Sequence, residues 1–269
     1  EEDYPPAEVG EAASRDVTLT AVDLEQLPAF MDALNAFAYA LTSVDPAAVA
    51  RARTYAQSFE SIFGDKVPPP YIDLGHFAKL VQEFAPSDEL DQAISDLQDA
   101  SQKLILSEMS GPNRPGATGL SIFFPTPELL AGVGTSDSEL SYTGYASRFA
   151  GASLWDEFLV YHYTNTDFDP DLADPALVSE ADGPSADIEA YSTPLLEAAA
   201  DVTTPGVETD ITIAPIEVSS DTIASDETVL LGTQITGADI GYIYVEAARY
   251  DEESDSWSIE DRDFVAAED

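Results

Sequence analysis

The spacing of apolar residues changes once along this chain, and that change limits the folds that the chain can adopt. Up to about residue 164 the apolar residues recur on one face of successive helices, whereas from about residue 200 they alternate with polar residues, as in half-buried strands. This pattern predicts a helix-rich first part and a small antiparallel β domain over residues 200–269. Residues 1–16 are expected to form a polar tail, and the acidic residues 165–199 a linker.

Five stretches of the first part carry the one-sided apolar pattern of an amphipathic helix. Two of them begin after a residue that can cap a helix, Asp23 for the first and Asp45, followed by Pro46, for the second. The second is expected to run to about Phe63, because Gly64 follows it. The predicted helices cover about residues 24–41, 46–63, 71–84, 88–107 and 145–164.

Only two segments of the first part have the composition of strands. Residues 17–22 are rich in β-branched side chains, and residues 120–125, LSIFFP, form an apolar run of the kind found inside a parallel or mixed sheet. Two strands so far apart in the sequence do not make an independent sheet. They either lie apart among the helices or add to a sheet supplied by residues outside this chain.

Four motifs follow one another in the first part. They are TLTAVDL, YIDLGHFAKLV, GATGLSIFFP and FAGASLWDEFLVYHYT. In this order, over about residues 15–165, they resemble the region downstream of the catalytic cysteine in clostripain-like cysteine peptidases. The resemblance implies an α/β fold class, with the C-terminal part of a caspase-like fold over residues 17–164 followed by the small antiparallel β domain.

The chemistry of that family is the attack of a cysteine thiolate, assisted by a histidine, on a peptide carbonyl. The resemblance implies a basic P1 residue in the substrate and a secreted bacterial protein that often depends on calcium. This chain has no cysteine and so no nucleophile. It is therefore expected to be the non-catalytic C-terminal portion of such a peptidase, bound to the N-terminal catalytic chain of the same precursor.

The alternative belongs to another functional class. A catalytically inactive, peptidase-derived extracellular protein could serve as a structural protein that self-assembles into a homo-oligomer or filament. The two isolated strands favour this alternative, because unpaired strand edges invite partner chains. The high negative charge opposes assembly unless cations screen it.

Thr20 and Asp23 are the candidate substrate-binding residues. If the resemblance holds, both lie at the C-terminal end of a sheet strand, where open α/β sheets bind ligands. Asp23 would then line the S1 pocket for an arginine or lysine side chain. The simpler interpretation is that Asp23 caps the following helix, and the two roles are compatible because a carboxylate has several lone pairs.

The segment DFDPDLAD places Asp167, Asp169 and Asp171 at alternate positions, as at the start of an EF-hand loop. The loop lacks the glycine and the glutamate of that motif, because Leu172 and Val178 stand in their places. A loose calcium site built from the three carboxylates is one interpretation, and a solvated acidic linker is the other.

The remaining candidates are interpreted as structural. His76 and His162 are the only histidines, and nothing in the sequence pairs either with a nucleophile. The glycine spacing around Ser121 does not match a nucleophile elbow. Arg114, in a loop rich in glycine and proline, is expected to hold that loop by pairing with an acidic residue.

Charge excludes some partners. The chain has 52 acidic and 10 basic residues, a formal net charge of −42. Such a surface repels phosphate backbones and anionic membranes, so nucleic acid is not expected as a partner. Membrane insertion is not expected either, since no stretch reaches the roughly 18 apolar residues of a spanning helix. The opening residues EEDYPP are typical of a mature or trimmed chain rather than of a signal peptide.

Overall fold

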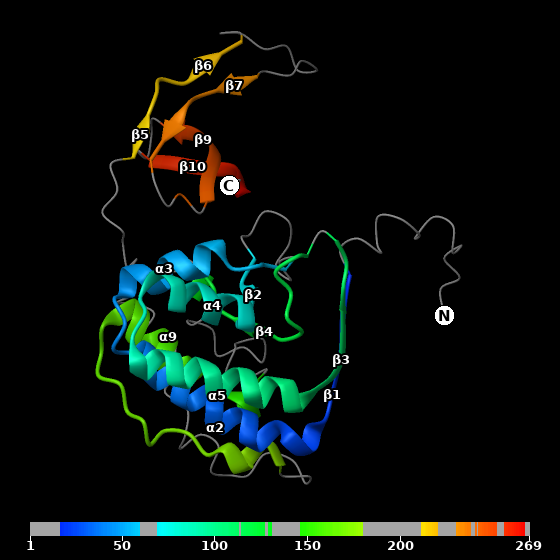
Figure 1. Cartoon of the computed structure of the whole chain (residues 1–269). Coiled ribbons are helices and arrows are strands. Elements are labelled where there is room, and N and C mark those ends of the chain that lie inside the picture. The colour runs from blue at the N-terminus through cyan, green and yellow to red at the C-terminus, as the bar shows by residue number, and fades with distance from the viewer. Residues whose placement is uncertain are drawn as a thin grey trace. The chain divides into compact units, whose positions relative to one another are not determined.

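The computed structural model divides the chain into two compact units, Glu1–Gly206 and Val207–Asp269, called unit 1 and unit 2 below (Figure 1). Unit 1 is a mixed α/β structure with small antiparallel sheets. The structure describes residues 17–59, 69–112, 114–126, 129–130, 146–179, 211–219, 230–237, 240, 242–251 and 256–266.

Helices make up most of the described part of unit 1. Helix α2 packs along α5 and also contacts α9, while α3 packs on α4 (Figure 1). None of the helices in the described ranges is long and apolar enough to cross a membrane. The helical elements are η1 (Leu24–Gln26), α2 (Leu27–Leu41), α3 (Pro46–Tyr55), α4 (Leu74–Phe84), α5 (Asp88–Leu104), α8 (Ser147–Ala152), α9 (Trp155–Thr164) and η2 (Pro175–Ser179).

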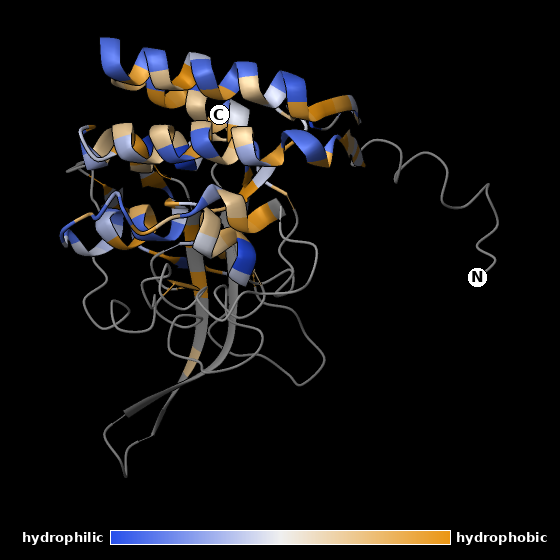
Figure 2. Ribbon diagram, turned by 90° about the horizontal axis from the view of Figure 1, so that it is seen from below, coloured by the Kyte–Doolittle hydropathy of each residue, from blue (hydrophilic) through white to orange (hydrophobic). Residues whose placement is uncertain are grey.

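Local signals explain where these helices begin. The Asp45 carboxylate accepts a hydrogen bond from the Ala47 backbone N–H at 3.0 Å, and Pro46 occupies the first position of α3. The Ser87 hydroxyl caps α5 in the same way, at 3.2 Å from the Leu90 nitrogen. Figure 2 shows hydrophobic residues gathered along one side of the helices of unit 1 and hydrophilic residues along the other, as the sequence pattern predicts.

The strands in the described part of unit 1 form two separate two-stranded ribbons. Strand β1 (Thr18–Val22) pairs antiparallel with β3 (Ile105–Ser110), and β2 (Tyr71–Asp73) pairs antiparallel with β4 (Ser121–Phe123). The strands predicted at 17–22 and 120–125 are therefore present as β1 and β4. The expectation of a parallel or mixed sheet around the second is wrong for the described residues, where β4 has one antiparallel neighbour.

Strand β2 replaces the start of the helix predicted at 71–84, and strand β3 replaces the end of the helix predicted at 88–107. The end of the helix predicted at 46–63 is also extended. Helix α3 ends at Tyr55 instead of about residue 63, because the chain turns extended and residues 57–59 pair with β2. The Asp73 N–H donates to the Gln57 carbonyl at 2.7 Å, and the Phe59 N–H donates to the Tyr71 carbonyl at 3.1 Å. Likewise α5 ends at Leu104, where the expected helix to about 107 gives way to the β3 ladder.

The core of unit 1 is centred on aromatic rings. The Phe124 ring lies edge-on to Phe77 and Trp155, with centroids 5.5 and 5.7 Å apart, an arrangement that aromatic quadrupoles favour. The Trp155 indole N–H donates to the Phe123 carbonyl at 2.6 Å, so burial leaves it satisfied. The predicted helix 145–164 is broken into α8 and α9, and Asn35 of α2 bridges the break: its side chain donates to the Ala152 carbonyl and accepts from the Leu154 N–H.

Unit 2 consists of antiparallel ribbons. The longest pairs the last two strands, which flank the turn predicted at DEESDS; residues 252–255 of that turn lie outside the described residues, as does Trp257's side chain. The predicted tail 1–16 and most of the predicted linker also lie outside them. The strands are β5 (Thr212–Ile213), β6 (Glu217–Val218), β7 (Leu231–Gly232), β8 (Ile235–Thr236), β9 (Tyr242–Asp251) and β10 (Ser256–Ala266), paired as β5–β8, β6–β7 and β9–β10.

Candidate functional site

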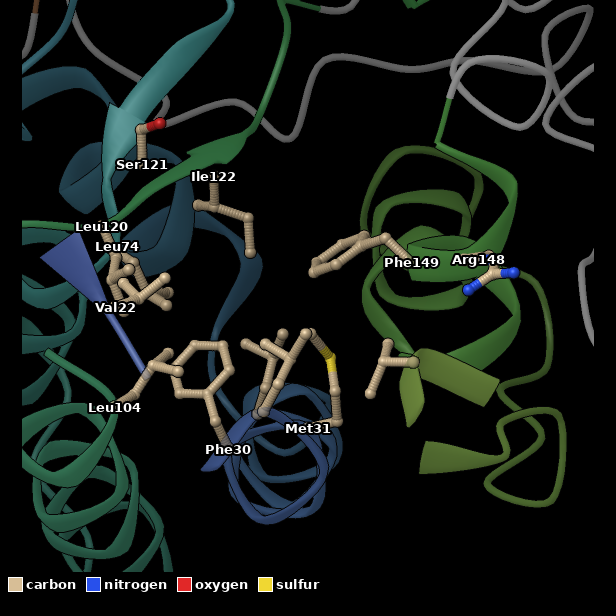
Figure 3. Close-up of a pocket in the computed structure, with 13 residues that line it drawn as sticks. Val22, Phe30, Met31, Leu74, Leu104, Leu120, Ser121, Ile122, Arg148 and Phe149 are labelled. Carbon is tan, nitrogen blue, oxygen red and sulfur yellow. The ribbon is translucent and has the colours of Figure 1, made fainter. Parts of the chain in front are cut away.

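An apolar pocket opens between the two ribbons of unit 1. Its volume is about 380 Å³. In Figure 3, Phe149 of α8 points across the pocket toward Ile122 of β4, and Phe30 and Met31 rise from α2. Only Ser121 and Arg148 among the lining residues carry polar groups. The lining residues are Val22, Leu27, Phe30, Met31, Leu34, Leu74, Leu104, Leu120, Ser121, Ile122, Arg148, Phe149 and Val178.

One face of the β1–β3 ribbon is both apolar and exposed. Leu19 and Met109 lie directly opposite each other across the ladder and share a face, as does Val17, two residues before Leu19. Their exposed fractions are 69%, 71% and 55%. We call these three residues the outer ribbon face. Within the described residues neither strand has a second neighbour, so an apolar surface and two free strand edges occur together.

Thr20 and Asp23, the predicted substrate-binding residues, lie at the inner side and the end of this ribbon. Thr20 is paired across the ladder with Glu108, and its hydroxyl faces the backbone of Gly119. The Asp23 Oδ1 atom accepts from the Glu25 N–H at 3.0 Å and caps η1, so the expected capping role is present. Its Oδ2 atom has no hydrogen-bond partner in the part of the chain that is described. Val22, beside Asp23, lines the apolar pocket.

A buried carboxylate, Asp73, ties the loop that precedes β4 to the start of α4. It is 0% exposed. Its Oδ1 atom accepts from the His76 N–H at 2.9 Å and from the Thr118 hydroxyl at 2.6 Å, and its Oδ2 atom accepts from the Thr118 N–H at 2.6 Å. A side chain at Gly75 would collide with the Thr118 hydroxyl. These contacts fix the backbone on which Ser121 reaches the pocket.

The two histidines take structural positions. The His76 Nδ1 atom accepts from the Gln57 backbone N–H at 3.0 Å, which leaves the proton of a neutral ring on Nε2. His162 packs against the rings of Phe158 and Phe124, and burial lowers its pKa to about 4, so its ring is neutral at neutral pH. Within the described residues, neither ring has a hydrogen bond to a serine or threonine hydroxyl.

Arg114 holds its loop, but through a different partner from the one expected. Its guanidinium donates to the Ser58 carbonyl at 3.0 Å, and no carboxylate within the described ranges pairs with it. The expected pairing with an acidic residue is therefore wrong. The physical reason is that residues 57–59, which leave α3 to pair with β2, present a backbone acceptor to this loop.

The three aspartates of the predicted calcium site are exposed. The Asp169 carboxylate accepts from the Asp171 N–H at 3.0 Å and so caps a turn, and Asp167 precedes it in the same segment. Nowhere in the described residues do three side chains of the metal-binding types gather at one point. A calcium site at these aspartates stays a prediction.

Sequence reasoning missed one pair of ionisable groups. Asp156 and Glu157 lie in the first turn of α9 and are almost completely buried. Burial, and after it the charge of Glu157, raises the pKa of Asp156 well above its ordinary value. Acidic residues at the start of a helix are ordinary in exposed helices, so the sequence carries no signal that these two face inward.

No family model matches this chain, and neither the curated proteins nor the solved structures contain a significant match to it.

Proposed function

We propose that this chain is the non-catalytic C-terminal portion of a secreted clostripain-like cysteine peptidase. It would complete the caspase-like sheet and one wall of the S1 pocket for a basic P1 residue, and the catalytic histidine and cysteine would come from an N-terminal chain of the same precursor. The proposal rests on the resemblance of the four motifs, and on a geometric feature that calls for such a partner.

That feature is the β1–β3 ribbon, whose two strands pair only with each other within the described residues. The outer ribbon face exposes Leu19 and Met109 by about two thirds, beside free strand edges. Monomeric proteins seldom leave adjoining apolar side chains on an unpaired ribbon, because the edge invites another strand. The apolar pocket is lined by Val22 of this ribbon and by Ile122 of β4, so an added strand would find apolar side chains beside the ribbon.

Asp23 supports the second half of the proposal. Its Oδ1 atom is used in capping η1, but its Oδ2 atom is available for a guanidinium or ammonium group. Because the Asp23 side chain is already held by its hydrogen bond at the start of η1, binding a basic side chain costs it little further conformational entropy. The high negative charge of the chain would attract basic substrates over longer distances.

The experiment begins with the native protein, purified without denaturation from the cells that produce it. A biotinylated arginyl chloromethyl ketone, which alkylates an active-site thiolate, should label a second chain that co-purifies with this one. Tandem mass spectrometry of its peptides should then place the label on a cysteine and find a histidine in the same chain. A homogeneous 269-residue species that neither carries a labelled partner nor cleaves arginyl substrates would refute the proposal.

Variants of the complex test the role of Asp23. Asp23→Asn should lower kcat/KM for arginyl substrates about 10- to 100-fold, since a hydrogen bond to a charged group contributes about 1.5–3 kcal/mol. Asp45→Asn is the matched control, because Asp45 also caps a helix through one backbone hydrogen bond from its side chain. If the two variants have equal kcat/KM for arginyl substrates, Asp23 does not line the S1 pocket.

Unit 2 favours a second candidate function, a catalytically inactive extracellular structural protein that self-assembles. Ile213, Val218 and Leu231 lie on short ribbon strands and are each at least half exposed. Edge pairing between copies would cover them, once salt or calcium screens the negative charge. Light scattering across NaCl and CaCl₂ concentrations decides: growth into large particles supports this function, and a discrete heterodimer under all conditions excludes it.

A further inference from the structure

A second cavity of unit 1 lies between helices α4 and α5, and we call it the helix cleft. Its volume is about 460 Å³, within the range of about 300–1,000 Å³ that small-molecule sites occupy. Strand β3 and the loop before β4 close one end of it, through Glu108 and Thr118. Among the described residues the two cavities share Leu74 and Leu120, and their other walls differ.

The floor of the helix cleft is aliphatic. It is made of side chains from α4, α5, the start of β3 and the residue before β4, namely Leu74, Ala78, Leu97, Ile105 and Leu120. Three of them belong to the buried core, and the other two are half-buried. A ligand with an apolar body would therefore gain free energy by covering this floor.

The rim of the helix cleft is polar, unlike that of the apolar pocket. Lys79, Gln98, Gln102 and Glu108 line it and are exposed. Within the described residues, the two carboxamides and the Glu108 carboxylate form no hydrogen bond or ion pair. A few convergent polar groups above an apolar floor are the usual composition of a small-molecule site.

Lys79 has one charged neighbour, which leaves it available to a ligand. Its Nζ atom lies 4.0 Å from the Glu83 Oε1 atom, and the two side chains are 66% and 55% exposed. An exposed pair of this kind contributes little to stability, because water already solvates both charges. A ligand carboxylate above the cleft can therefore compete with Glu83 for the ammonium group.

The two charges of the rim lie at opposite ends of the helix cleft. Glu108 is at the loop end, because an added Cβ at Gly119 would lie 3.4 Å from its Cβ atom. The preceding residue, Thr118, packs against Gly75 at the start of α4. Lys79 follows Gly75 by four residues, about 6 Å further along the helix. The cleft thus has a positive end and a negative end.

The length of the helix cleft limits what can reach both charges. Along α5 it runs from Leu97 to Ile105, which is about 12 Å. A single amino acid carries its ammonium and carboxylate groups on one carbon, so it is too short. An extended peptide of three residues spans roughly 10 Å. Its peptide groups both donate and accept hydrogen bonds, as do the carboxamides of Gln98 and Gln102.

We propose that the helix cleft binds a short peptide of about three residues, with apolar side chains and two free termini. Its carboxylate pairs with Lys79, and its ammonium group pairs with Glu108. Such a peptide carries no net charge, so the net charge of −42 does not repel it as it would repel an anion. The described walls belong to this chain, so binding does not depend on the proposed catalytic partner.

The first test is calorimetric titration of the full 269-residue chain with alanyl-leucyl-alanine. We expect saturable binding with a Kd of about 1 mM or tighter. Acetylation of the amino terminus or amidation of the carboxyl terminus should each weaken binding about fivefold, as the loss of one exposed ion pair predicts. Triglycine should bind more weakly because it has no apolar side chains. Lack of saturable binding, equal affinity of the blocked peptides, or free leucine binding as tightly as the tripeptide would overturn the proposal.

The second test assigns each peptide terminus to one side chain. Lys79→Gln should weaken binding of the free peptide about fivefold and leave that of the amidated peptide unchanged. Glu108→Gln should do the same for the free and the acetylated peptide. The matched controls are Lys103→Gln and Glu89→Gln, which change exposed residues of α5 outside the cleft and should bind like the parent. If a cleft variant weakens binding of the free and blocked peptides equally, or no more than its control does, the assignment of the termini is wrong.

Discussion

Replacing Asp73 with alanine should destabilise unit 1 by roughly 3–5 kcal/mol. The carboxylate is fully buried and accepts three hydrogen bonds, one from His76 and two from Thr118. Removing an acceptor that buried donors rely on costs about 1–3 kcal/mol for each donor left without a partner. The total cost should be smaller than three times the upper value, because water can enter the space that the side chain leaves and hydrogen-bond to some of these donors.

Asp45→Ala is the control that separates capping from loop attachment. Asp45 caps α3 through one backbone hydrogen bond of 3.0 Å in an exposed position, and loss of such a cap costs about 1 kcal/mol. Asp73 caps α4 in the same manner through His76. The difference between the two variants, roughly 2–4 kcal/mol, therefore measures the two bonds from Thr118.

Two measurements check this reasoning. Urea unfolding in the Trp257→Phe background gives the free energy of unfolding reported by Trp155. Hydrogen exchange reports on the Thr118 amide, which donates to the Asp73 carboxylate at 2.6 Å and should exchange much faster in Asp73→Ala. If Asp73→Ala lowers the free energy of unfolding no more than Asp45→Ala does, and the Thr118 amide keeps its protection, then Asp73 does not hold this loop in place.

Further variants test other parts of unit 1. Phe124→Ala should cost about 3–5 kcal/mol in the same unfolding assay, because the ring is fully buried among aromatic side chains. His162 should remain neutral at pH 5 in an NMR titration, and His162→Phe should remove the loss of stability as the pH falls from 6.5 toward 4, where the unfolded chain binds a proton that the folded chain excludes. Asn165→Ala should cost about 1 kcal/mol and Asn165→Gly should cost less, since Asn165 ends α9 with a φ of 55°.

The helices of unit 1 were predictable because their signals are local. Asp45 and Pro46 mark the start of α3, and the apolar stripe of α2 gives its buried face, including Phe30 and Leu34. Where helices end was harder to predict. Helix α3 stops at Tyr55 because the following residues pair with Tyr71–Asp73, which are distant in sequence. The partner, rather than local propensity, decides such an ending.

The candidate site divides in the same way. The capping role of Asp23 was predictable from one residue and the helix that follows it. The apolar pocket was not, because its lining comes from β1, α2, α4, α5, β4, α8 and η2 and exists only after they pack. The inward orientation of Asp156 also depends on packing, since α9 is apolar around most of its circumference and leaves little surface for its acidic residues to face.

The outer ribbon face also has a consequence for handling the isolated chain. At low ionic strength the net charge of −42 makes copies of the chain repel one another. The exposed Leu19 and Met109 side chains of two copies then do not come into contact. At 1 M salt the Debye length falls to about 3 Å, and kosmotropic anions also strengthen apolar association. Colloidal stability should therefore be greatest in dilute buffer, and ammonium sulfate should precipitate the chain through its ribbon before most proteins of similar charge.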